Sequence, residues 1–347
     1  MQRALQIISQ IIRLLRPAPG VFLFFIAPIV GALLSGSTPP SSFFNPFMLL
    51  FLCILYGGGA IIARELTLYW GKGWPTLLAL GATFGIIEEG LLLKSFFDPR
   101  WKDLGLLDTY GRWLGVNWVW SVQAIPFQAI FSIAIPILIV SLLFPRRRAE
   151  RWAGPRALLL LIVMFALMLV LGFLFLSPYH APLVPYLITL VIVAGLLFLA
   201  RYLPRTITVT KSTDVAQPLR FGLVGFLGTL TLYLIGWILP TTLLPFWVAI
   251  LLIFLLVLAV GFAILHMSSN ILGWTERHQV ALVSGALAFF VLLAPITEIT
   301  HWQRPESLGG LTFVALICAG LLYLLNRRIR KREQKQQMQQ QRVVINP

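Results

Sequence analysis

Two adjacent glutamates within an apolar stretch are the residues of this sequence best suited to chemistry. Glu88 and Glu89 lie in the run PTLLALGATFGIIEEGLLLKSFF. Ionisable side chains inside such a stretch are costly, and they tend to face a cavity, a partner or a transport path. Two carboxyls this close in a low dielectric do not both ionise easily, so we expect the pair to share a proton at neutral pH. Such a pair could exchange a proton or bind a cation.

Helical spacing predicts which way this pair faces. At 100° per residue, Gly81, Gly85 and Glu88 share one face of a helix, and Glu89 lies at the edge of that face. Two glycines four residues apart let a second helix approach closely. We therefore expect the Glu88 face to point into a helix bundle. A buried acid that only locks helices together is the alternative interpretation.

A second polar seam lies in the next apolar stretch, NWVWSVQAIPFQAIFSIAIPILIVSLLF. Gln128 and Ser132 fall on one face of it, and Pro126 and Pro136 should kink the helix because proline removes a backbone hydrogen bond. Gln128 is near the centre of its span, as Glu88 is of its own, so we expect the amide to face that carboxyl.

Further polar groups lie at the ends of other apolar stretches. Glu298 and His301 are three residues apart, within reach of each other on one helical turn. Tyr179 and His180 precede another stretch. Together with Glu88 these groups could form an outward-opening polar vestibule, although each of them taken singly is typical of a helix end at the membrane interface.

The composition shows which elements must position these side chains. Hydrophobic residues make up 59% of the 347 residues and charged residues 11%, against about 45–50% and about 25% in a soluble globular domain. The chain is therefore expected to be an integral membrane protein. This class excludes secreted, disulfide-stabilised, nucleic-acid-binding and disordered proteins, and we read Cys53 and Cys318 as small buried hydrophobic residues.

Runs of about 20 apolar residues, the length that crosses a bilayer, predict about ten transmembrane helices. They lie near residues 18–35, 46–63, 75–96, 117–144, 157–176, 182–200, 220–239, 244–266, 280–298 and 309–325. With the N-terminus inside, the inner segments hold 22 of the 27 Lys and Arg residues and the outer segments hold five. Cytoplasmic loops retain Lys and Arg, so the sequence predicts an all-α polytopic bundle with both termini in the cytoplasm.

The bundle is expected to be one domain, residues 18–326, with a flanking segment on either side. Residues 1–17 have the pattern of a short amphipathic helix in the membrane interface. Residues 327–347 form a basic, Gln-rich segment that we expect to be a cytoplasmic tail. The outer segment 97–116 carries Trp, Tyr and charged residues, which predicts an ordered element at the interface.

One block of the sequence resembles proteins of a known kind. The stretch from Arg64 to Pro99, which contains REL, GKGWPTLLALGATFGIIEEGLLLKSFF and DP, is similar to a block in an uncharacterised family of multi-pass prokaryotic membrane proteins. The resemblance covers about a tenth of the chain. It implies a multi-pass membrane protein of the prokaryotic plasma membrane.

A second, partial resemblance is to the CAAX protease (prenyl endopeptidase) family, whose motifs are a diglutamate followed by Arg, F-x-x-x-H, and H-x-x-x-N/D. Glu88 and Glu89 match the acids, but Lys94 stands one position late in place of Arg, and Phe127 is followed by Phe131 where the family has His. The resemblance implies a membrane hydrolase.

The third motif of that family is matched by spacing alone, in His266 and Asn270. His266 lies about ten residues past the centre of its predicted span, or about 15 Å at 1.5 Å per residue. Glu88 is expected near the midplane. A glutamate that activates water beside metal-bound histidine needs them within a few ångströms, so the two groups are not expected to meet.

The leading functional hypothesis is a permease-like or transport-associated protein. Its candidate intramembrane site comprises Glu88, Glu89, Gln128, Ser132, Glu298 and His301. The expected partners are the lipid bilayer and a proton, cation or small-molecule substrate, with no nucleic acid, and no cofactor, metal ligand or catalytic residue is assigned. The alternatives are a diglutamate hydrolase and a non-catalytic scaffold or sensor.

Overall fold

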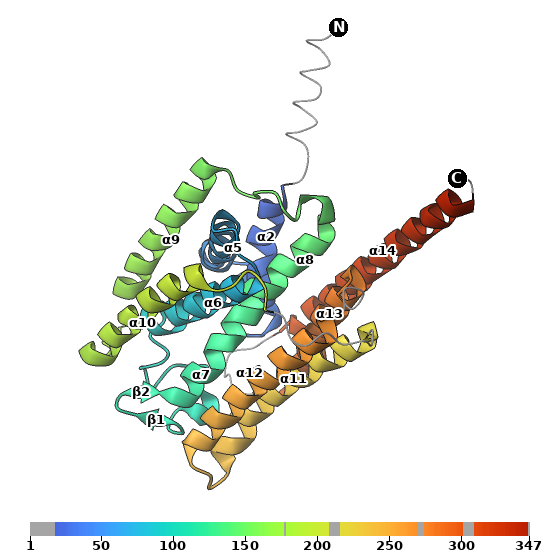
Figure 1. The fold of residues 1–347 in the computed structure, drawn as a ribbon. Coiled ribbons are helices and arrows are strands. Elements are labelled where there is room, and N and C mark those ends of the chain that lie inside the picture. Colours follow the sequence, from blue (N-terminus) through green and yellow to red (C-terminus); the bar gives the residue numbers. More distant parts are fainter. Residues whose placement is uncertain (1–17, 177, 208–215, 270–273, 301–308, 346–347) are drawn as a thin grey trace.

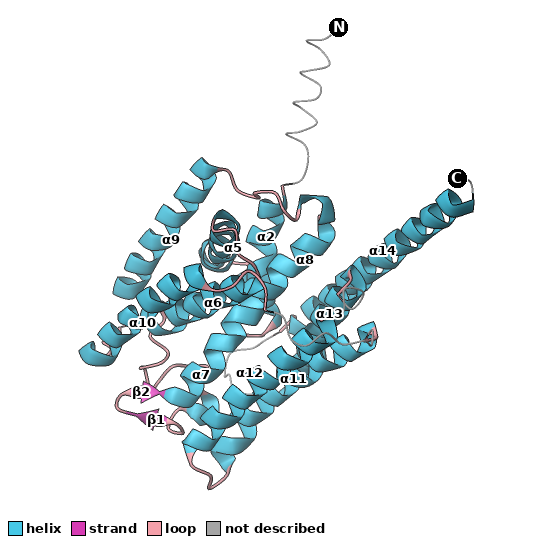
Figure 2. Ribbon diagram, in the orientation of Figure 1, coloured by secondary structure: helices cyan, strands magenta, loops and turns pink. Residues whose placement is uncertain are grey.

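The chain folds as an all-α bundle, as the sequence predicts (Figure 1). The computed structural model describes residues 18–176, 178–207, 216–269, 274–300 and 309–345. Within these residues the only strands form one short hairpin (Figure 2). The amphipathic helix expected over residues 1–17 lies outside the described residues.

Proline and asparagine residues define where several helices begin. Pro19, Pro46, Pro155 and Pro218 each occupy the first turn of a helix, where the missing N–H is not needed and the fixed φ suits the helix. Asn45 caps the helix that starts at Pro46, because its side chain accepts a hydrogen bond from the N–H of Phe47 at 3.0 Å.

The first half of the described chain builds spans in which α-helices are interrupted by wider π-helical turns, labelled η1, η2, η3 and η5. The elements are α2 (Pro19–Pro28), η1 (Ile29–Leu34), α3 (Pro40–Phe43), α4 (Pro46–Leu52), η2 (Cys53–Gly58), α5 (Gly59–Tyr69), α6 (Trp74–Gly85), η3 (Ile86–Leu92), α7 (Trp118–Phe127), η5 (Gln128–Ala134) and α8 (Ile135–Leu143). Between η3 and α7 lie a 3-10 turn, η4 (Gly105–Leu107), and the hairpin of β1 (Arg112–Trp113) and β2 (Val116–Asn117).

The second half is made of longer uninterrupted helices. They are α9 (Pro155–Phe175), α10 (Leu183–Tyr202), α11 (Pro218–Ile238), α12 (Phe246–Ser268), α13 (Glu276–Thr300) and α14 (Leu311–Ile345), with 3-10 turns η6 (Pro145–Arg147) and η7 (Leu239–Thr241). The described part of the segment expected as a tail therefore continues α14 as helix.

Among the described residues, nine helices are long and apolar enough to cross a membrane. They are Pro46–Tyr69, Trp74–Leu92, Trp118–Leu143, Pro155–Phe175, Leu183–Tyr202, Pro218–Thr241, Phe246–Ser268, Glu276–Thr300 and Leu311–Lys335. The first predicted span, 18–35, corresponds to the shorter apolar helix Pro19–Leu34. The polytopic bundle is thus confirmed, with the first span shorter than a full crossing length.

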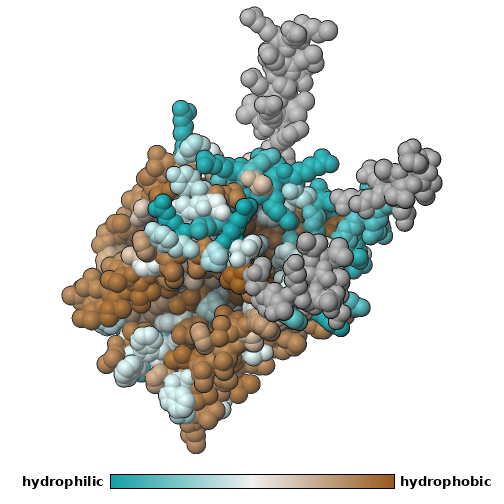
Figure 3. Space-filling model, in the orientation of Figure 1, coloured by the Kyte–Doolittle hydropathy of each residue, from teal (hydrophilic) through white to brown (hydrophobic). Residues whose placement is uncertain are grey.

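The two ends of the bundle differ in polarity. The start of α2 and the end of α14 lie toward the same end of the molecule, and the β1–β2 hairpin lies toward the other (Figure 1). Apolar residues cover the sides of the visible face, whereas hydrophilic residues collect at the end that holds the loop between α8 and α9 (Figure 3). This loop carries exposed Arg146, Arg148 and Arg151, which agrees with its predicted place on the inner side.

The predicted orientation can be tested with reporters. We expect a reporter fused after Pro347 to be active only in its cytoplasmic form, because 22 of 27 basic residues then lie inside. A reporter inserted after Gly115, in the turn of the β1–β2 hairpin, should be active only in its exported form and serves as the matched control. Export of the Pro347 fusion would contradict the topology.

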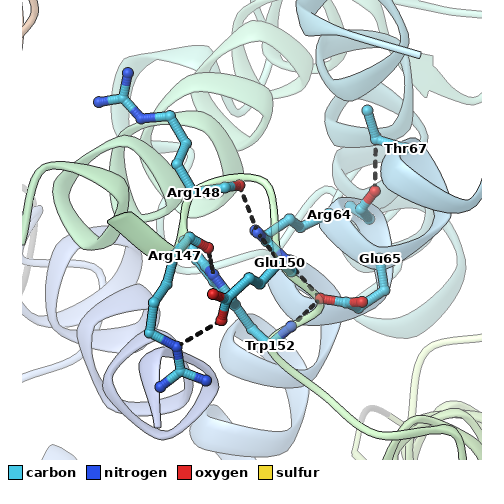
Figure 4. Close-up of polar contacts among 8 residues, drawn as sticks. Arg64, Glu65, Thr67, Arg147, Arg148, Glu150 and Trp152 are labelled. Atoms are coloured by element: carbon cyan, nitrogen blue, oxygen red, sulfur yellow. Dashed lines mark hydrogen bonds and ion pairs between the residues drawn. The ribbon is translucent and has the colours of Figure 1, made fainter. Parts of the chain in front are cut away.

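At the end of the bundle that holds the loop between α8 and α9, a buried ion pair within α5 hydrogen-bonds to that loop (Figure 4). Arg64 Nη1 lies 2.6 Å from Glu65 Oε1, and Arg64 Nη2 donates to the carbonyls of Arg148 and Glu150 at 3.0 and 2.8 Å. The N–H of Trp152 donates to Glu65 Oε1 at 2.9 Å, and the guanidinium lies 3.4 Å from the Trp152 ring centre. This cluster holds the inner loop against α5.

At the outer end, the segment expected to be ordered is folded against the bundle. The Asn117 side chain donates to the carbonyl of Leu107, and Arg112 Nη1 donates to the carbonyl of Phe97 at 2.7 Å. The chain from 98 to 117 therefore forms a fixed cover above η3 and α7, and the prediction of an ordered element is confirmed.

Candidate functional site

A cavity of about 430 Å³ lies between the first and second halves of the bundle. It reaches from Glu88, Glu89 and Gln128 in the buried interior to the outer segments 35–38 and 101–107. Leu106 on its lining is 48% exposed, which marks the mouth. By the predicted topology the cavity opens to the outside. Its volume is within the range of small-molecule sites.

The four predicted polar residues of the interior, and Tyr56 beside them, all lie on π-helical turns. Tyr56 is in η2, Glu88 and Glu89 are in η3, and Gln128 and Ser132 are in η5. A π turn inserts one extra residue into a helix and is frequent at functional sites. A proline explains the π turn at η5, because Pro136 has no N–H to donate to the carbonyl four residues earlier.

Glycines bring η5 against α6, as the sequence predicts. A Cβ at Gly81 would lie 2.9 Å from the Cα of Ala129, and one at Gly85 would lie 2.9 Å from the Cβ of Gln128. Only a residue without a side chain allows so close an approach at these positions. The contact places Gln128 beside the acidic pair.

Both carboxyl oxygens of Glu89 accept hydrogen bonds. Gln128 Nε2 donates to Oε1 at 2.9 Å, and Ser95 Oγ donates to Oε2 at 2.5 Å. Ser95 in turn accepts from Trp120 Nε1 at 3.0 Å, and Ser132 donates to Gln128 Oε1. The expected pairing of Gln128 with Glu88 is therefore wrong, because the wide turn in η3 presents Glu89 to η5.

Glu88 has a different environment. Its side chain is fully buried, and its Oε1 accepts from the hydroxyl of Tyr56. Its Oε2 has no hydrogen-bond partner, although it is buried and the residue lines the cavity. A buried polar atom without a partner is unusual in a native structure and calls for a ligand, ion or water.

Two other buried polar atoms without a partner belong to residues that line the same cavity. They are Trp101 Nε1, a donor, and Gln123 Oε1, an acceptor. Among the residues that the structure describes, these two and Glu88 Oε2 are the buried side-chain atoms without a hydrogen bond. Their common location is what distinguishes this cavity from a packing defect.

Aromatic rings form much of the remaining wall. The rings that line the cavity belong to Phe51, Tyr56, Trp101, Trp120, Phe127, Tyr233, Trp237 and Phe290. Two of these rings pack on Phe131, which does not line the cavity: its ring centre lies 5.1 Å from that of Phe127 and 5.0 Å from that of Phe290. Phe127, Phe131 and Phe290 thus form a ring cluster next to the cavity.

The described outer polar groups expected to join the site, Glu298, Tyr179 and His180, do not line the cavity. The carboxylate of Glu298 accepts from the N–H groups of Gly310 and Thr312, both at 2.8 Å, so it caps the start of α14. His301 lies outside the described residues. Glu298 is thus brought to a helix terminus and not to Glu88.

The residues behind the hydrolase hypothesis are also separated from the acids. His266 lies on an exposed face of α12, stacked on Phe262 with ring centres 5.9 Å apart. Asn270 lies outside the described residues. Within the described ranges, no group of three or more His, Cys, Asp or Glu residues is placed to hold a metal ion.

Lys94, expected to offset the charge of the acids, follows the end of η3 with a φ of 59°. Its Nζ donates to the carbonyls of Phe173 and Tyr179 at 2.9 and 3.1 Å and lies 4.6 Å from the Phe173 ring centre. Burial lowers the pKa of Lys94 from its ordinary value, and the charge of Asp98 opposes that shift. Its contacts tie η3 to the loop between α9 and α10.

Sequence reasoning missed Tyr56, Trp101 and Gln123. A signal existed for two of them, because Tyr56 precedes three glycines and Gln123 is a second amide in the span that contains Gln128. Trp101 gave no comparable signal, because it is one of several aromatic residues in the outer segment. Its role depends on how that segment folds over the bundle.

Comparison with known proteins identifies a family without assigning an activity. A family model described as an uncharacterized membrane protein family matches residues 21–344. No curated protein and no solved structure matches the chain.

Proposed function

The chain belongs to this uncharacterized membrane protein family, and from that premise we propose that it is a permease-like protein of a prokaryotic plasma membrane. The cavity binds a small solute from the outer side. Glu88 exchanges a proton or holds a cation as access alternates, and Glu89 with Gln128 and Ser132 fixes the geometry around it.

The observation that supports this proposal most directly is the unpartnered Oε2 of Glu88 in the cavity lining. A lone carboxylate oxygen in a low dielectric is expensive to keep charged. Because Glu89 is surrounded by donors, it is suited to the ionised form, and Glu88 is suited to carry the proton that the pair shares. A proton held beside a solute site is what coupled transport requires.

The ring cluster next to the cavity suits the role of an inner barrier. Phe131 and Phe290 are 2% and 1% exposed, and they join η5 to α13. These two elements belong to different halves of the bundle, so a small movement of one half against the other would part the rings. Such rocking of bundle halves around a fixed site is how many transporters alternate access.

Alternating access predicts that one cavity position reacts from both sides of the membrane. Ala294 lines the cavity and is 1% exposed. In a background with Cys53→Ala and Cys318→Ala, we expect Ala294→Cys to react with a membrane-impermeant maleimide added outside. We also expect it to react in inside-out vesicles, because the barrier opens part of the time.

Ala315→Cys is the matched control, because Ala315 is also 1% exposed but does not line the cavity. It should react from neither side. Both vesicle orientations are to be measured with a pH gradient in each direction. Labelling of Ala294→Cys from the outside alone would contradict transport and favour a receptor or scaffold.

A further inference from the structure

We propose that the solute bound in this cavity is a dissolved organic cation, namely a protonated amine carried on an apolar body. This inference rests on the proposed function only for the side from which the solute enters. It adds the chemical class of the solute. Three features of the cavity support this inference: its charge, its unpaired polar atoms and its aromatic rings.

The charge of the interior favours a cation. Glu88 and Glu89 are the ionisable acids of the cavity floor, and among the residues that the structure describes the one basic residue of the lining, Lys102, lies at the mouth next to Asp103. With one proton shared by the acids, the floor keeps about one negative charge. An anionic ligand would be repelled there, and a neutral one would leave the charge without a counter-ion.

Two of the three unpaired atoms require a ligand that donates, whereas the third, Trp101 Nε1, is itself a donor. Glu88 Oε2, when ionised, and Gln123 Oε1 are both acceptors. An ammonium group has three donors and no acceptor, so it suits the unpartnered Oε2 of Glu88. Binding of the ammonium also replaces the proton on Glu88, which exchanges one cation for another.

The walls suit an apolar body beside that charge. The rings of Phe127, Tyr233 and Phe290 surround the inner part of the cavity, with ring centres of Tyr233 and Phe290 5.5 Å apart. Aromatic faces attract organic cations through their quadrupoles, and aromatic cages are a known solution for ammonium ligands. A bare metal cation has no apolar part that could pack against these aromatic rings.

The mouth indicates that the ligand comes from water. Segment 35–38 and residues Lys102 and Asp103 form the rim, and Ser37 and Lys102 are partly or fully exposed. A lipid would have to enter between helices, whereas a dissolved ion enters directly through this polar rim.

A matched set of three indole compounds tests the charge requirement. Tryptamine is cationic, tryptophol is its neutral alcohol counterpart and indole-3-propionate is its anionic counterpart. Calorimetric titration of the purified full-length protein in detergent at pH 7 should give tryptamine at least tenfold tighter binding than tryptophol. Indole-3-propionate should show no binding at 10 mM.

Two variants test whether tryptamine binds at Glu88. Glu88→Gln should weaken tryptamine at least tenfold and leave tryptophol within twofold, because the variant removes charge and keeps shape. Glu150→Gln, a change at an exposed carboxyl of the inner loop, is the matched control and should leave all three affinities unchanged. Retained tryptophol binding shows that the Glu88→Gln cavity is intact.

The substrate class is overturned if tryptophol or indole-3-propionate binds the parent protein as tightly as tryptamine. It is also overturned if tryptamine does not bind at 10 mM, or if Glu88→Gln leaves tryptamine affinity unchanged. Transport is decided separately by the labelling of Ala294→Cys. Selective tryptamine binding with labelling from the outside alone would keep the cation site and reject transport.

Discussion

Replacing Gly285 by alanine should lower the stability of the folded bundle by about 1–3 kcal/mol, the range for overpacking of a close-packed interior. A Cβ at Gly285 would lie 1.9 Å from the carbonyl oxygen of Gly222. The obstacle is backbone, so no side chain can rotate away. To relieve this clash, α11 and α13 must separate along their whole contact. That contact is close elsewhere too, since a Cβ at Gly225 would lie 2.4 Å from the Leu282 carbonyl oxygen.

Two other glycines provide graded controls for this prediction. Gly261 in α12 has nothing within 4 Å of an added Cβ, so Gly261→Ala should leave stability unchanged or raise it slightly. Gly222→Ala should be milder than Gly285→Ala, since its Cβ would lie 3.3 Å from the Ala281 carbonyl oxygen. The measurement is the free energy of unfolding in mixed micelles. Equal stability of Gly285→Ala and Gly261→Ala would show that the two helices are not in this contact.

The sequence is sufficient to predict the helical bundle for a simple physical reason. In hydrocarbon every backbone polar group must be satisfied within the chain, so each long apolar run has to be a helix. The glycines at 81 and 85 likewise predict a close helix contact, because the geometry of a helix face follows from spacing alone. Both expectations are confirmed.

The detailed site was less predictable, because it depends on where the helices depart from regular spacing. The matching depth of Gln128 and Glu88 at the centres of their spans predicts that they pair, but η3 (Ile86–Leu92) is a π turn, and the amide donates to Glu89. No residue pattern around Glu88 predicts that a π turn occurs there. Residues from other spans, such as Tyr56, can be assigned to the site only once the packing of the bundle is known.

Glu298 shows a second limit, because its carboxylate makes a contact with a helix start that no local pattern predicts. Its spacing from His301 suggested a polar vestibule, yet its carboxylate accepts two N–H groups at the start of α14. The first turn of a helix has unsatisfied donors that attract a carboxylate. Which helix start lies nearby is a property of the fold, and no local pattern reports it.

The two adjacent glutamates should respond differently to the same substitution. Glutamine replaces one carboxyl oxygen with an NH2 group, which only donates. At Glu89 each oxygen already accepts from a donor, Ser95 or Gln128. Gln128 cannot simply turn over, because its Oε1 accepts from Ser132, so the new NH2 would have to face Ser95 Oγ, which would then accept and stop donating to this side chain. Glu89→Gln thus removes the Ser95 donation and the charge that strengthens both hydrogen bonds, and we expect it to cost about 1–3 kcal/mol of folding free energy.

Glu88→Gln should instead fold with nearly the parent stability and lose function. Tyr56 can still donate to the remaining oxygen, and the new NH2 takes the place of an oxygen that has no partner. The variant cannot release a proton, so labelling of Ala294→Cys from the inner side should no longer respond to a pH gradient. Unfolding midpoints of both variants and this labelling are the measurements. If Glu88→Gln is destabilised as much as Glu89→Gln, the pair chiefly locks helices, because only a saturated hydrogen-bond network at both acids would make the two changes equally costly.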